Sequence, residues 1–328
     1  MLLTLLPDSR VLDIEPGETL LAALRRQKEP ISYSCEDGRC GLCHCVLTYP
    51  DRVSSENCLS ADPLDKSIVL ACQTAPNADC LLELPDRNDI LVLPPQIIRA
   101  QIVAIVPMAE RVRRIFLRPQ KSVQFAPGQH FEVTLSSNII RMYSAACLPS
   151  DPELIFDIQI HRDGRASRYL VENLKVGDTL RLRGPLGTTY LRCHGVEPTL
   201  YVSSGTGLGP MMALLRASVD AETKNPMHIY SGFLMAEDAY GTGDLASLVK
   251  KLRVVRRNER VIGGGILGRG ERHGLLTDII ADDLGCLSGF RAYIFGSPHA
   301  VDSTARLLRR MGIAPERLHI EPFHYSSL

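Results

Sequence analysis

The sequence has no long hydrophobic run. None of its apolar stretches approaches the ~20 residues needed to cross a bilayer, and the opening MLLTLLPDSR is interrupted at Pro7. This opening is too short for a secretory signal and is better interpreted as a first strand. We therefore expect a cytosolic (cytoplasmic) protein without a membrane partner, a setting in which clustered cysteines are more often metal ligands or redox groups than disulfides.

The sequence also has no net charge, since 37 Lys and Arg residues balance 37 Asp and Glu residues. Nucleic-acid-binding proteins are usually basic, so the balance argues against a nucleic acid partner. However, residues 1–92 contain 8 basic and 15 acidic residues, a net charge of −7, and residues 93–328 contain 29 and 22, a net charge of +7. This division suggests charge-guided docking or partner choice, although two solvated surfaces of unlike composition would give the same counts.

The cysteines lack the second C-x2-C pair that zinc sites usually have. In CEDGRCGLCHC the spacing is C-x4-C-x2-C, and a further candidate ligand follows in VLACQ. This is the spacing of plant-type [2Fe–2S] sites, with Cys35, Cys40, Cys43 and Cys72 as candidate ligands. The alternative is a set of buried or metal-free cysteines. The off-pattern cysteines are expected to be small core residues: Cys45, Cys58, Cys80, Cys147, Cys193 and Cys286.

The segment around these cysteines is predicted to be a domain of its own. At 328 residues, the chain is long enough for two or three domains of ~100–150 residues each. Leu20, Leu21 and Leu24 recur at helical spacing in PGETLLAALRRQ, and CLLELP indicates a strand. Together with the cysteine motif, residues 1–92 resemble the β-grasp fold of plant-type ferredoxins.

After a stiff linker at Pro94 and Pro95, short strand-like segments with turn signals continue to about residue 195. They contain RMYS, a match to R-x-Y-S, and GRAS, a match to G-x-x-S at the start of the predicted helix ASRYLVENL. In type and order, these motifs resemble the flavin-binding domain of the ferredoxin–NADP reductase family. The resemblance implies an antiparallel Greek-key β-barrel over residues 98–195 that binds FAD.

The same resemblance gives the motif residues their roles. Arg141 would pair with the FAD pyrophosphate through two parallel hydrogen bonds, Tyr143 would stack on the flavin, and Ser144 would donate a hydrogen bond near N5, the atom that accepts hydride. Backbone N–H groups at the start of the helix would bind the second phosphate. Further FAD-binding residues implied by the resemblance are Met142, Ile158, Ile160, His161, Gly164, Arg165, Ala166, Ser167 and Phe323.

From about residue 196, strands and helices alternate, which indicates a Rossmann-like parallel sheet over residues 196–328. PTLYVSSGTGLGPMMALLRA predicts a strand, a glycine-rich turn and a helix that opens at Pro210. GTGLGP resembles the pyridine-nucleotide turn of the same family, and Glu321 and Phe323 match its acidic-x-aromatic ending beside the hydride site and the flavin. The nucleotide-binding residues implied are Gly205, Thr206, Gly207, Leu208, Gly209, Pro210, Gly296 and Ser297.

Three features depart from the family pattern. Ser203 and Ser204 replace the usual glycines before GTG, where a serine adds bulk but also a hydroxyl that could bind phosphate. Phe295 replaces a cysteine beside the nicotinamide, where its ring could alter how the nicotinamide reaches the flavin; we count it with Ser144 and Glu321 as a candidate catalytic residue. SGFLMAEDAY lacks an arginine that could pair with a 2′-phosphate, which favours NADH over NADPH.

Over essentially its whole length, the chain resembles the reductase component of bacterial ring-hydroxylating dioxygenases of the naphthalene and salicylate types. ISYSC, VLACQ, GPLGTTYLR and GTGLGP carry this resemblance. It implies an NADH-dependent flavin iron–sulfur oxidoreductase that delivers electrons through FAD and a [2Fe–2S] cluster to a Rieske-type ferredoxin or an oxygenase. Two alternatives stay open: the reductase of a soluble di-iron monooxygenase, and a ferredoxin-like electron carrier whose nucleotide domain has decayed.

Overall fold

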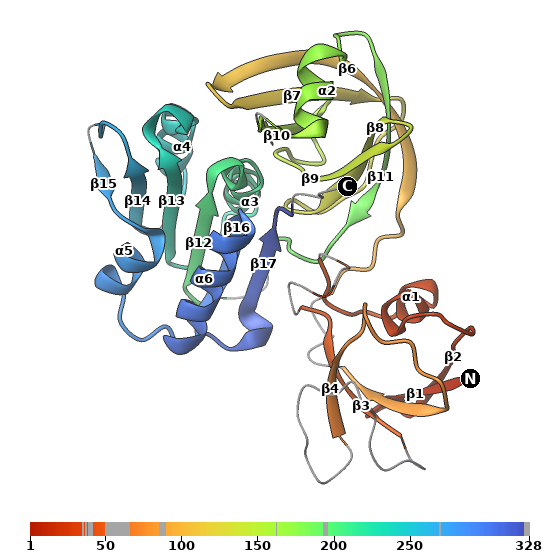
Figure 1. The fold of residues 1–328 in the computed structure, drawn as a ribbon. Coiled ribbons are helices and arrows are strands. Elements are labelled where there is room, and N and C mark those ends of the chain that lie inside the picture. Colours follow the sequence, from red (N-terminus) through yellow and green to blue (C-terminus); the bar gives the residue numbers. More distant parts are fainter. Residues whose placement is uncertain are drawn as a thin grey trace. The chain divides into compact units, whose positions relative to one another are not determined.

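The computed structural model describes residues 1–34, 36, 38, 42–49, 66–84, 90–161, 163–192, 196–268 and 270–324. The chain divides into two compact units, Met1–Val92 and Leu93–Leu328, called here the N-terminal and the C-terminal unit. Figure 1 shows one sheet in the first unit and two in the second. Within the described ranges, every helix is too short or too polar to span a membrane.

The N-terminal unit is a mixed sheet with one helix. Strand β1 pairs in parallel with β5, whereas the other neighbouring strands are antiparallel, in the order β2-β1-β5-β3-β4. The strand predicted for the opening residues and the helix predicted from the leucine spacing are both confirmed. The elements are β1 (Leu2–Leu6), β2 (Arg10–Asp13), α1 (Leu20–Arg26), β3 (His44–Thr48), β4 (Lys66–Leu70) and β5 (Cys80–Glu83).

Helix α1 buries its apolar side on this sheet. Thr19 caps the helix, since its hydroxyl accepts a hydrogen bond from the backbone N–H of Ala22 at 3.2 Å. Leu20 and Leu24 are fully buried, as their helical spacing predicts. The helix therefore supplies much of the core of the N-terminal unit.

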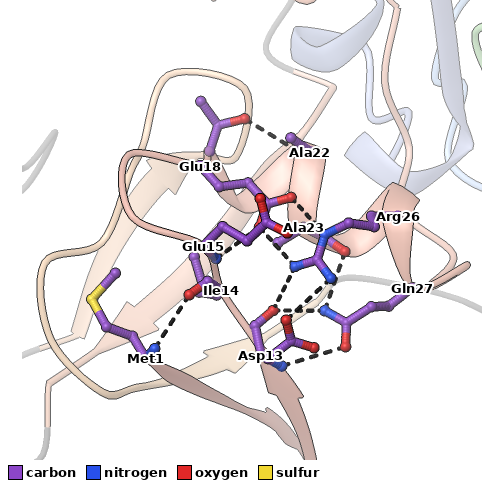
Figure 2. A network of polar contacts seen from close by, with 10 residues as sticks. Met1, Asp13, Ile14, Glu15, Glu18, Ala22, Ala23, Arg26 and Gln27 are labelled. Carbon is purple, nitrogen blue, oxygen red and sulfur yellow. Dashed lines mark hydrogen bonds and ion pairs between the residues drawn. The ribbon is translucent and has the colours of Figure 1, made fainter.

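A network of polar contacts fastens the other side of α1 to the end of β2 (Figure 2). Arg26 donates to the two carboxylate oxygens of Glu18 at 2.9 and 2.8 Å and to the backbone oxygen of Asp13 at 3.0 Å. Gln27 donates to the same backbone oxygen at 2.7 Å. The last turn of the helix is thereby tied both to the strand and to the loop that precedes the helix.

We expect Glu18→Gln to destabilise the N-terminal unit at neutral pH but not in acid. The hydrogen bond from Arg26 lowers the pKa of Glu18 below its usual value. The carboxylate therefore stabilises the fold above its unfolded-state pKa of about 4.3, and this contribution is lost as the pH falls through the lower folded-state pKa. Thermal unfolding of the full chain, followed from acid to neutral pH, measures the effect.

Glu15→Gln is the matched control, because Glu15 enters the network through its backbone N–H and carbonyl groups. Its melting temperature should follow that of the wild type at each pH. A Glu18→Gln variant that loses as much stability in acid as at neutral pH would show that the ion pair with Arg26 is not the cause.

The first sheet of the C-terminal unit is antiparallel throughout. Its strands follow the order β10-β7-β6-β11-β8-β9, and the two edge strands β10 and β9 come into contact, which gives the predicted Greek-key barrel. A continuous apolar cluster that includes Phe131 and Phe156 fills it. The elements are β6 (Gln96–Ala109), β7 (Val112–Pro119), β8 (His130–Ser136), β9 (Ile139–Ser144), β10 (Leu154–Gln159), α2 (Arg165–Glu172) and β11 (Thr179–Leu186).

The second sheet is parallel throughout, in the order β15-β14-β13-β12-β16-β17, with helices packed around it (Figure 1). Its central strand β12 is buried along nearly its whole length, as strands covered on both faces are. The strands are β12 (Thr199–Ser204), β13 (Met227–Met235), β14 (Val255–Gly264), β15 (Glu271–His273), β16 (Arg291–Gly296) and β17 (Leu318–Pro322). The helices are α3 (Leu208–Asp220), α4 (Thr242–Val249), α5 (Leu276–Asp283) and α6 (Pro298–Arg310).

One helix boundary differs from the prediction. Helix α3 begins at Leu208, two residues before Pro210. Proline is tolerated in the first turn because the N–H groups there have no intrahelical acceptor. The glycine-rich turn is correspondingly shorter and forms one turn of 3₁₀ helix, η1 (Gly205–Gly207).

Candidate functional site

Two of the four candidate metal ligands meet in the N-terminal unit. The Sγ atoms of Cys43 and Cys72 are 3.3 Å apart, well beyond the ~2.05 Å of a disulfide. Cys43 directly precedes β3 and Cys72 follows β4, and the backbone N–H of Ala71 donates to the carbonyl of Cys43 at 2.8 Å. Both side chains are buried. Cys35 and Cys40 lie outside the described residues.

A side chain that the sequence analysis missed lies against this pair. Gln73 points its amide Nε2 at Sγ of Cys72, at 3.5 Å, and at the backbone oxygen of Glu36, at 3.4 Å. N–H groups aimed at ligating sulfur stabilise its negative charge and tune the potential of a cluster. The glutamine that follows the cysteine in VLACQ was the sequence signal that could have identified this contact.

The off-pattern cysteines largely behave as predicted, with one exception. Cys45, Cys80 and Cys147 are buried in cores, and burial raises the pKa of the Cys80 thiol to about 11, so this thiol stays protonated at neutral pH. The prediction for Cys286 is wrong, because its side chain is exposed; in the loop after α5 the next residue, Leu287, takes the buried position instead. Cys58 and Cys193 lie outside the described residues.

The R-x-Y-S motif forms strand β9 of the barrel. Tyr143 points inward against Phe156, with ring centroids 6.3 Å apart, and burial raises its pKa. Ser144 ends the strand and is 8% exposed, while Met142 alternates to the outer face. Arg141 is half-buried and donates to the backbone oxygen of Ile140 at 2.7 Å.

The G-x-x-S motif forms the start of helix α2. Ser167 closes the turn, because its hydroxyl accepts a hydrogen bond from the backbone N–H of His161 at 3.0 Å. Gly164 is the N-cap, so the N–H groups of Arg165, Ala166 and Ser167 belong to the first turn and have no intrahelical acceptor. A helix start with this geometry is suited to a phosphate group. The neighbouring strand β10 and the segment after it carry Ile158, which is buried, and Ile160, which is half-buried.

The GTG motif lies at the carboxyl end of the central strand β12. Gly207 packs on the end of β16 so closely that a Cβ atom there would be 2.3 Å from the backbone oxygen of Phe295, which excludes any side chain. Thr206, Leu208, Gly209 and Pro210 are buried around this turn. Gly205 and Gly296 both have positive φ angles, +56° and +140°.

Two serines join the starts of two helices at this edge. The Ser204 hydroxyl accepts a hydrogen bond from the backbone N–H of Ser297 at 3.2 Å, and the two hydroxyl oxygens are 3.3 Å apart. Ser297 is the N-cap of α6, and Ser204 precedes the turn into α3. Two helix N-termini thus adjoin one another, an arrangement that favours an anion. Ser203 is 1% exposed, and its hydroxyl has no partner within the described residues.

The remaining candidates lie near the chain's C-terminus. Phe323 donates its backbone N–H to the carbonyl of Gly296 at 2.7 Å and packs on the core of the parallel sheet. Glu321 is buried and lies 2.5 Å from His130 of the barrel strand β8. The side chain of Phe295 is fully buried in the same core, so it lies under the turn and has no exposed surface at the edge of the sheet.

Comparison with known proteins finds two domain families in the chain. Residues 3–77 match the 2Fe-2S iron-sulfur cluster binding domain family, and residues 104–190 match the oxidoreductase FAD-binding domain family. The reductase component of the naphthalene 1,2-dioxygenase/salicylate 5-hydroxylase systems of Ralstonia sp. is 37% identical, over 97% of both chains. The corresponding naphthalene 1,2-dioxygenase reductase component of Pseudomonas putida is 35% identical, over 99% of both. The chain belongs to this reductase family.

Solved structures of other reductases share the fold of this reductase. The cytochrome P450 reductase of Amycolatopsis has a TM-score of 0.77 at 26% identity, covering 98% of both chains. The ferredoxin reductase in carbazole 1,9a-dioxygenase has a TM-score of 0.70 at 26% identity, with the same coverage. The reductase is thus an oxidoreductase with a [2Fe–2S] domain, an FAD-binding barrel and a parallel-sheet domain.

The residues of the reductase fit these groups. Cys43 and Cys72 present two sulfur atoms close enough to bind a single metal ion, and thiolate is the ligand that iron–sulfur clusters use. For FAD, the strand–helix pair β9 and α2 combines a cation, an inward tyrosine and a helix start that can accept phosphate.

A buried polar cluster that the sequence analysis missed connects the barrel to the parallel-sheet part of the reductase's C-terminal unit. Asp157 of β10 accepts two hydrogen bonds from Arg114 of β7, at 2.7 and 2.9 Å, and a third from the hydroxyl of Tyr240, at 2.8 Å. Burial, followed by the charge of Asp157, raises the pKa of Tyr240, which keeps it a neutral donor. The barrel is thereby fixed to the segment that follows β13 within this unit.

We expect Phe295→Cys to destabilise the C-terminal unit by about 2–4 kcal/mol, because it opens a cavity in a well-packed core. None of the Phe295 side chain is exposed. Phe295→Leu, which retains most of the volume, should cost about half as much. Chemical denaturation of the full chain gives both values. Equal stability of Phe295→Cys and wild type would mean that the ring is not packed as described.

Proposed function

We propose that this reductase transfers electrons from NADH through FAD and a [2Fe–2S] cluster to a Rieske-type ferredoxin or to the oxygenase of an aromatic ring-hydroxylating dioxygenase system. The observation that carries the proposal is the 3.3 Å approach of Cys43 and Cys72, residues that come from separate loops of the N-terminal unit. Such a pair distinguishes an electron-transferring reductase from a simple flavin reductase. When bound, FAD turns the two-electron hydride of NADH into single electrons that the cluster can carry.

The residues of the barrel hold and orient the flavin in this proposal. Arg141 and the first N–H groups of α2 neutralise the phosphates, Tyr143 supports the ring, and Ser144 donates a hydrogen bond at N5. The bound cofactor is enclosed by further side chains of this unit, namely Met142, Ile158, Ile160, His161 and Phe323. Burial, and then the nearby Arg111, lower the pKa of His161, so this imidazole is neutral at physiological pH and adds no charge beside the phosphates.

The carboxyl edge of the parallel sheet binds the dinucleotide in this proposal. The N–H groups at the starts of α3 and α6 face the pyrophosphate, and Ser204 and Ser297 add hydroxyls beside them. Glu237 lies in the turn Ala236–Asp238 after β13, and Arg111 is engaged by Asp238. An acidic side chain there accepts a hydrogen bond from a ribose hydroxyl and repels a 2′-phosphate. We therefore propose NADH as the preferred donor, which the ratio of kcat/KM for NADH and NADPH tests.

The dioxygenase assignment rests on the degree of similarity. The naphthalene-type reductase components are 35–37% identical, whereas a propane 2-monooxygenase reductase component of Mycolicibacterium goodii is 25% identical. The net charge of −7 on residues 1–92 also favours an electron acceptor with a basic docking surface. We propose domain limits of 1–92, 98–195 and 196–328, and a cytoplasmic location, which the unpaired buried thiols of Cys80 and Cys147 support.

Anaerobic titration of the purified full chain with NADH tests the function. We expect the visible absorption of the flavin to bleach first and a [2Fe–2S] signal to appear by electron paramagnetic resonance as electrons are added. Bleaching without a cluster signal would refute electron transfer through the N-terminal unit. Flavin that saturating NADH leaves oxidised would favour the carrier with a decayed nucleotide domain.

A further inference from the structure

A buried contact joins the two sheets of the C-terminal unit. Nδ1 of His130, at the start of the barrel strand β8, lies 2.5 Å from Oε1 of Glu321, in the last strand of the parallel sheet. His130 is 2% exposed and Glu321 is 5% exposed. Because two lone pairs at this distance would repel each other, one of the two atoms carries a hydrogen.

Because both side chains are buried, breaking this contact would destabilise the protein more than breaking a surface ion pair. Exposed pairs contribute little because water and salt screen them, whereas removal of one partner of a buried pair leaves the other without its partner in a poorly solvating interior. Separation of His130 from Glu321 would therefore be resisted. The contact holds the end of β17 against the start of β8.

His130 also neighbours the strand predicted to bind the flavin. In the ladder between β8 and β9, His130 is directly opposite Ser144. The two strands continue this pairing beyond β8, where the backbone N–H of Ala145 donates to the carbonyl of Gln129 at 3.0 Å. His130 thus contacts the carboxyl group of Glu321 on β17 and adjoins Ser144 on β9.

The backbone of GPLG, residues 184–187, packs closely against the imidazole of His130. A Cβ atom on Gly187 would lie 2.8 Å from Nδ1 and 2.9 Å from Cε1 of His130, and 3.7 Å from Oε2 of Glu321. The carbonyl of Gly187 in turn accepts a hydrogen bond from Gln129 at 2.9 Å. Gly187 has a φ angle of +81°, so both its conformation and its packing exclude a side chain.

We propose that His130 is a positioning residue for hydride transfer, which holds the carboxyl group of Glu321 at the edge of the barrel where Ser144 lies. This inference rests on the proposed function, since it adds a residue to the same site. His130 is then one of the side chains that link the barrel to the parallel sheet. A misplaced Glu321 would slow the reaction at the flavin without preventing the binding of NADH.

Two substitutions separate positioning from mere support. His130→Asn keeps a side-chain N–H near the place of Nδ1, whereas His130→Leu keeps bulk but removes the donor. In the full chain with both cofactors, we expect His130→Leu to slow flavin reduction at saturating NADH by roughly tenfold or more, with little change in the NADH concentration that gives half the maximal rate. His130→Asn should restore most of the rate. The exposed His273 of β15 supplies the control, since His273→Gln should leave the rate unchanged.

A double-mutant cycle gives a second readout. If His130 acts through Glu321, the double variant His130→Leu/Glu321→Gln should be no slower than the slower single variant, because residues that act as one unit are not additive. The same cycle in thermal unfolding of the cofactor-free chain should show coupling between the two side chains. Rates that multiply in the double variant would overturn the proposal.

The two proposals fail in different ways. Wild-type flavin that NADH does not reduce would overturn the proposed function and, with it, the role of His130. A wild type that is reduced normally, together with an equally fast His130→Leu variant, would overturn the role of His130 alone. A His130→Leu variant that loses FAD or melts far below the wild type while His130→Asn is equally slow would assign His130 to structural support instead.

Discussion

Replacing Cys72 with serine is expected to abolish reduction of a ferredoxin, while NADH still bleaches the flavin. Cys72 holds one of the two sulfur atoms that meet at 3.3 Å in the N-terminal unit, and a serine hydroxyl is a poor substitute for thiolate at an iron–sulfur site. The flavin motifs belong to the other unit, Leu93–Leu328. Loss of the cluster therefore interrupts the pathway after the flavin.

Cys80→Ser is the matched control for this experiment. Cys80 lies in the same unit and is 2% exposed, but its thiol packs in the core. Iron and acid-labile sulfide content, visible absorption and acceptor reduction should remain close to wild type in Cys80→Ser and fall to background in Cys72→Ser. A Cys72→Ser protein that keeps its iron and its acceptor activity would refute the assignment of Cys72 as a ligand.

The short motifs could be predicted from the sequence because each depends on neighbouring residues. RMYS lies in strand β9, GRAS opens helix α2, and GTG forms the turn between β12 and α3. Turns and helix starts are decided within a few residues by conformational freedom and by backbone N–H groups without partners. The error at Pro210 has the same local origin, since proline is compatible with several positions in a first turn.

Contacts between distant residues could not be predicted in this way. Nothing in FAPGQHFEV indicates that its histidine meets Glu321, because the two residues come together only when β17 packs beside β8. Asp157 lies opposite Arg114 in the ladder between β10 and β7, but it meets Tyr240 only where the barrel packs against the segment after β13. Such partners require the tertiary fold, and in a single sequence no spacing rule connects them.

For Phe295, the sequence could not predict whether the side chain faces a ligand or the core. Its place after YI and before GSP suggested a position beside the nicotinamide, because a related pattern has a cysteine there. In the fold, β16 alternates its side chains, and Phe295 shares a face with Tyr293 and a buried cluster with Leu208 of α3. Whether a residue at the end of a strand faces a ligand or the core depends on the helix that covers it. Its catalytic role stays a prediction.

Replacing Arg141 with leucine is expected to weaken FAD binding by roughly 10- to 100-fold, the loss of one charge-assisted hydrogen-bonded contact of about 1.5–3 kcal/mol. Arg141 lies on β9 beside Tyr143, and its guanidinium is held over the backbone oxygen of Ile140. Arg141→Lys should be intermediate, because an ammonium group keeps the charge but not the planar pair of donors. Quenching of FAD fluorescence by cofactor-free protein measures the dissociation constants.

Arg99→Leu is the control for this series, because Arg99 is an exposed arginine on β6 of the same sheet. Its removal changes the net charge as Arg141→Leu does, but far from the motif. If general attraction between a basic unit and the phosphates governed binding, the two variants would weaken FAD binding equally. High salt would then reduce the effect of both substitutions. A specific contact predicts that only Arg141→Leu loses affinity, and that the gap persists at high salt because the contact is short-ranged and directional.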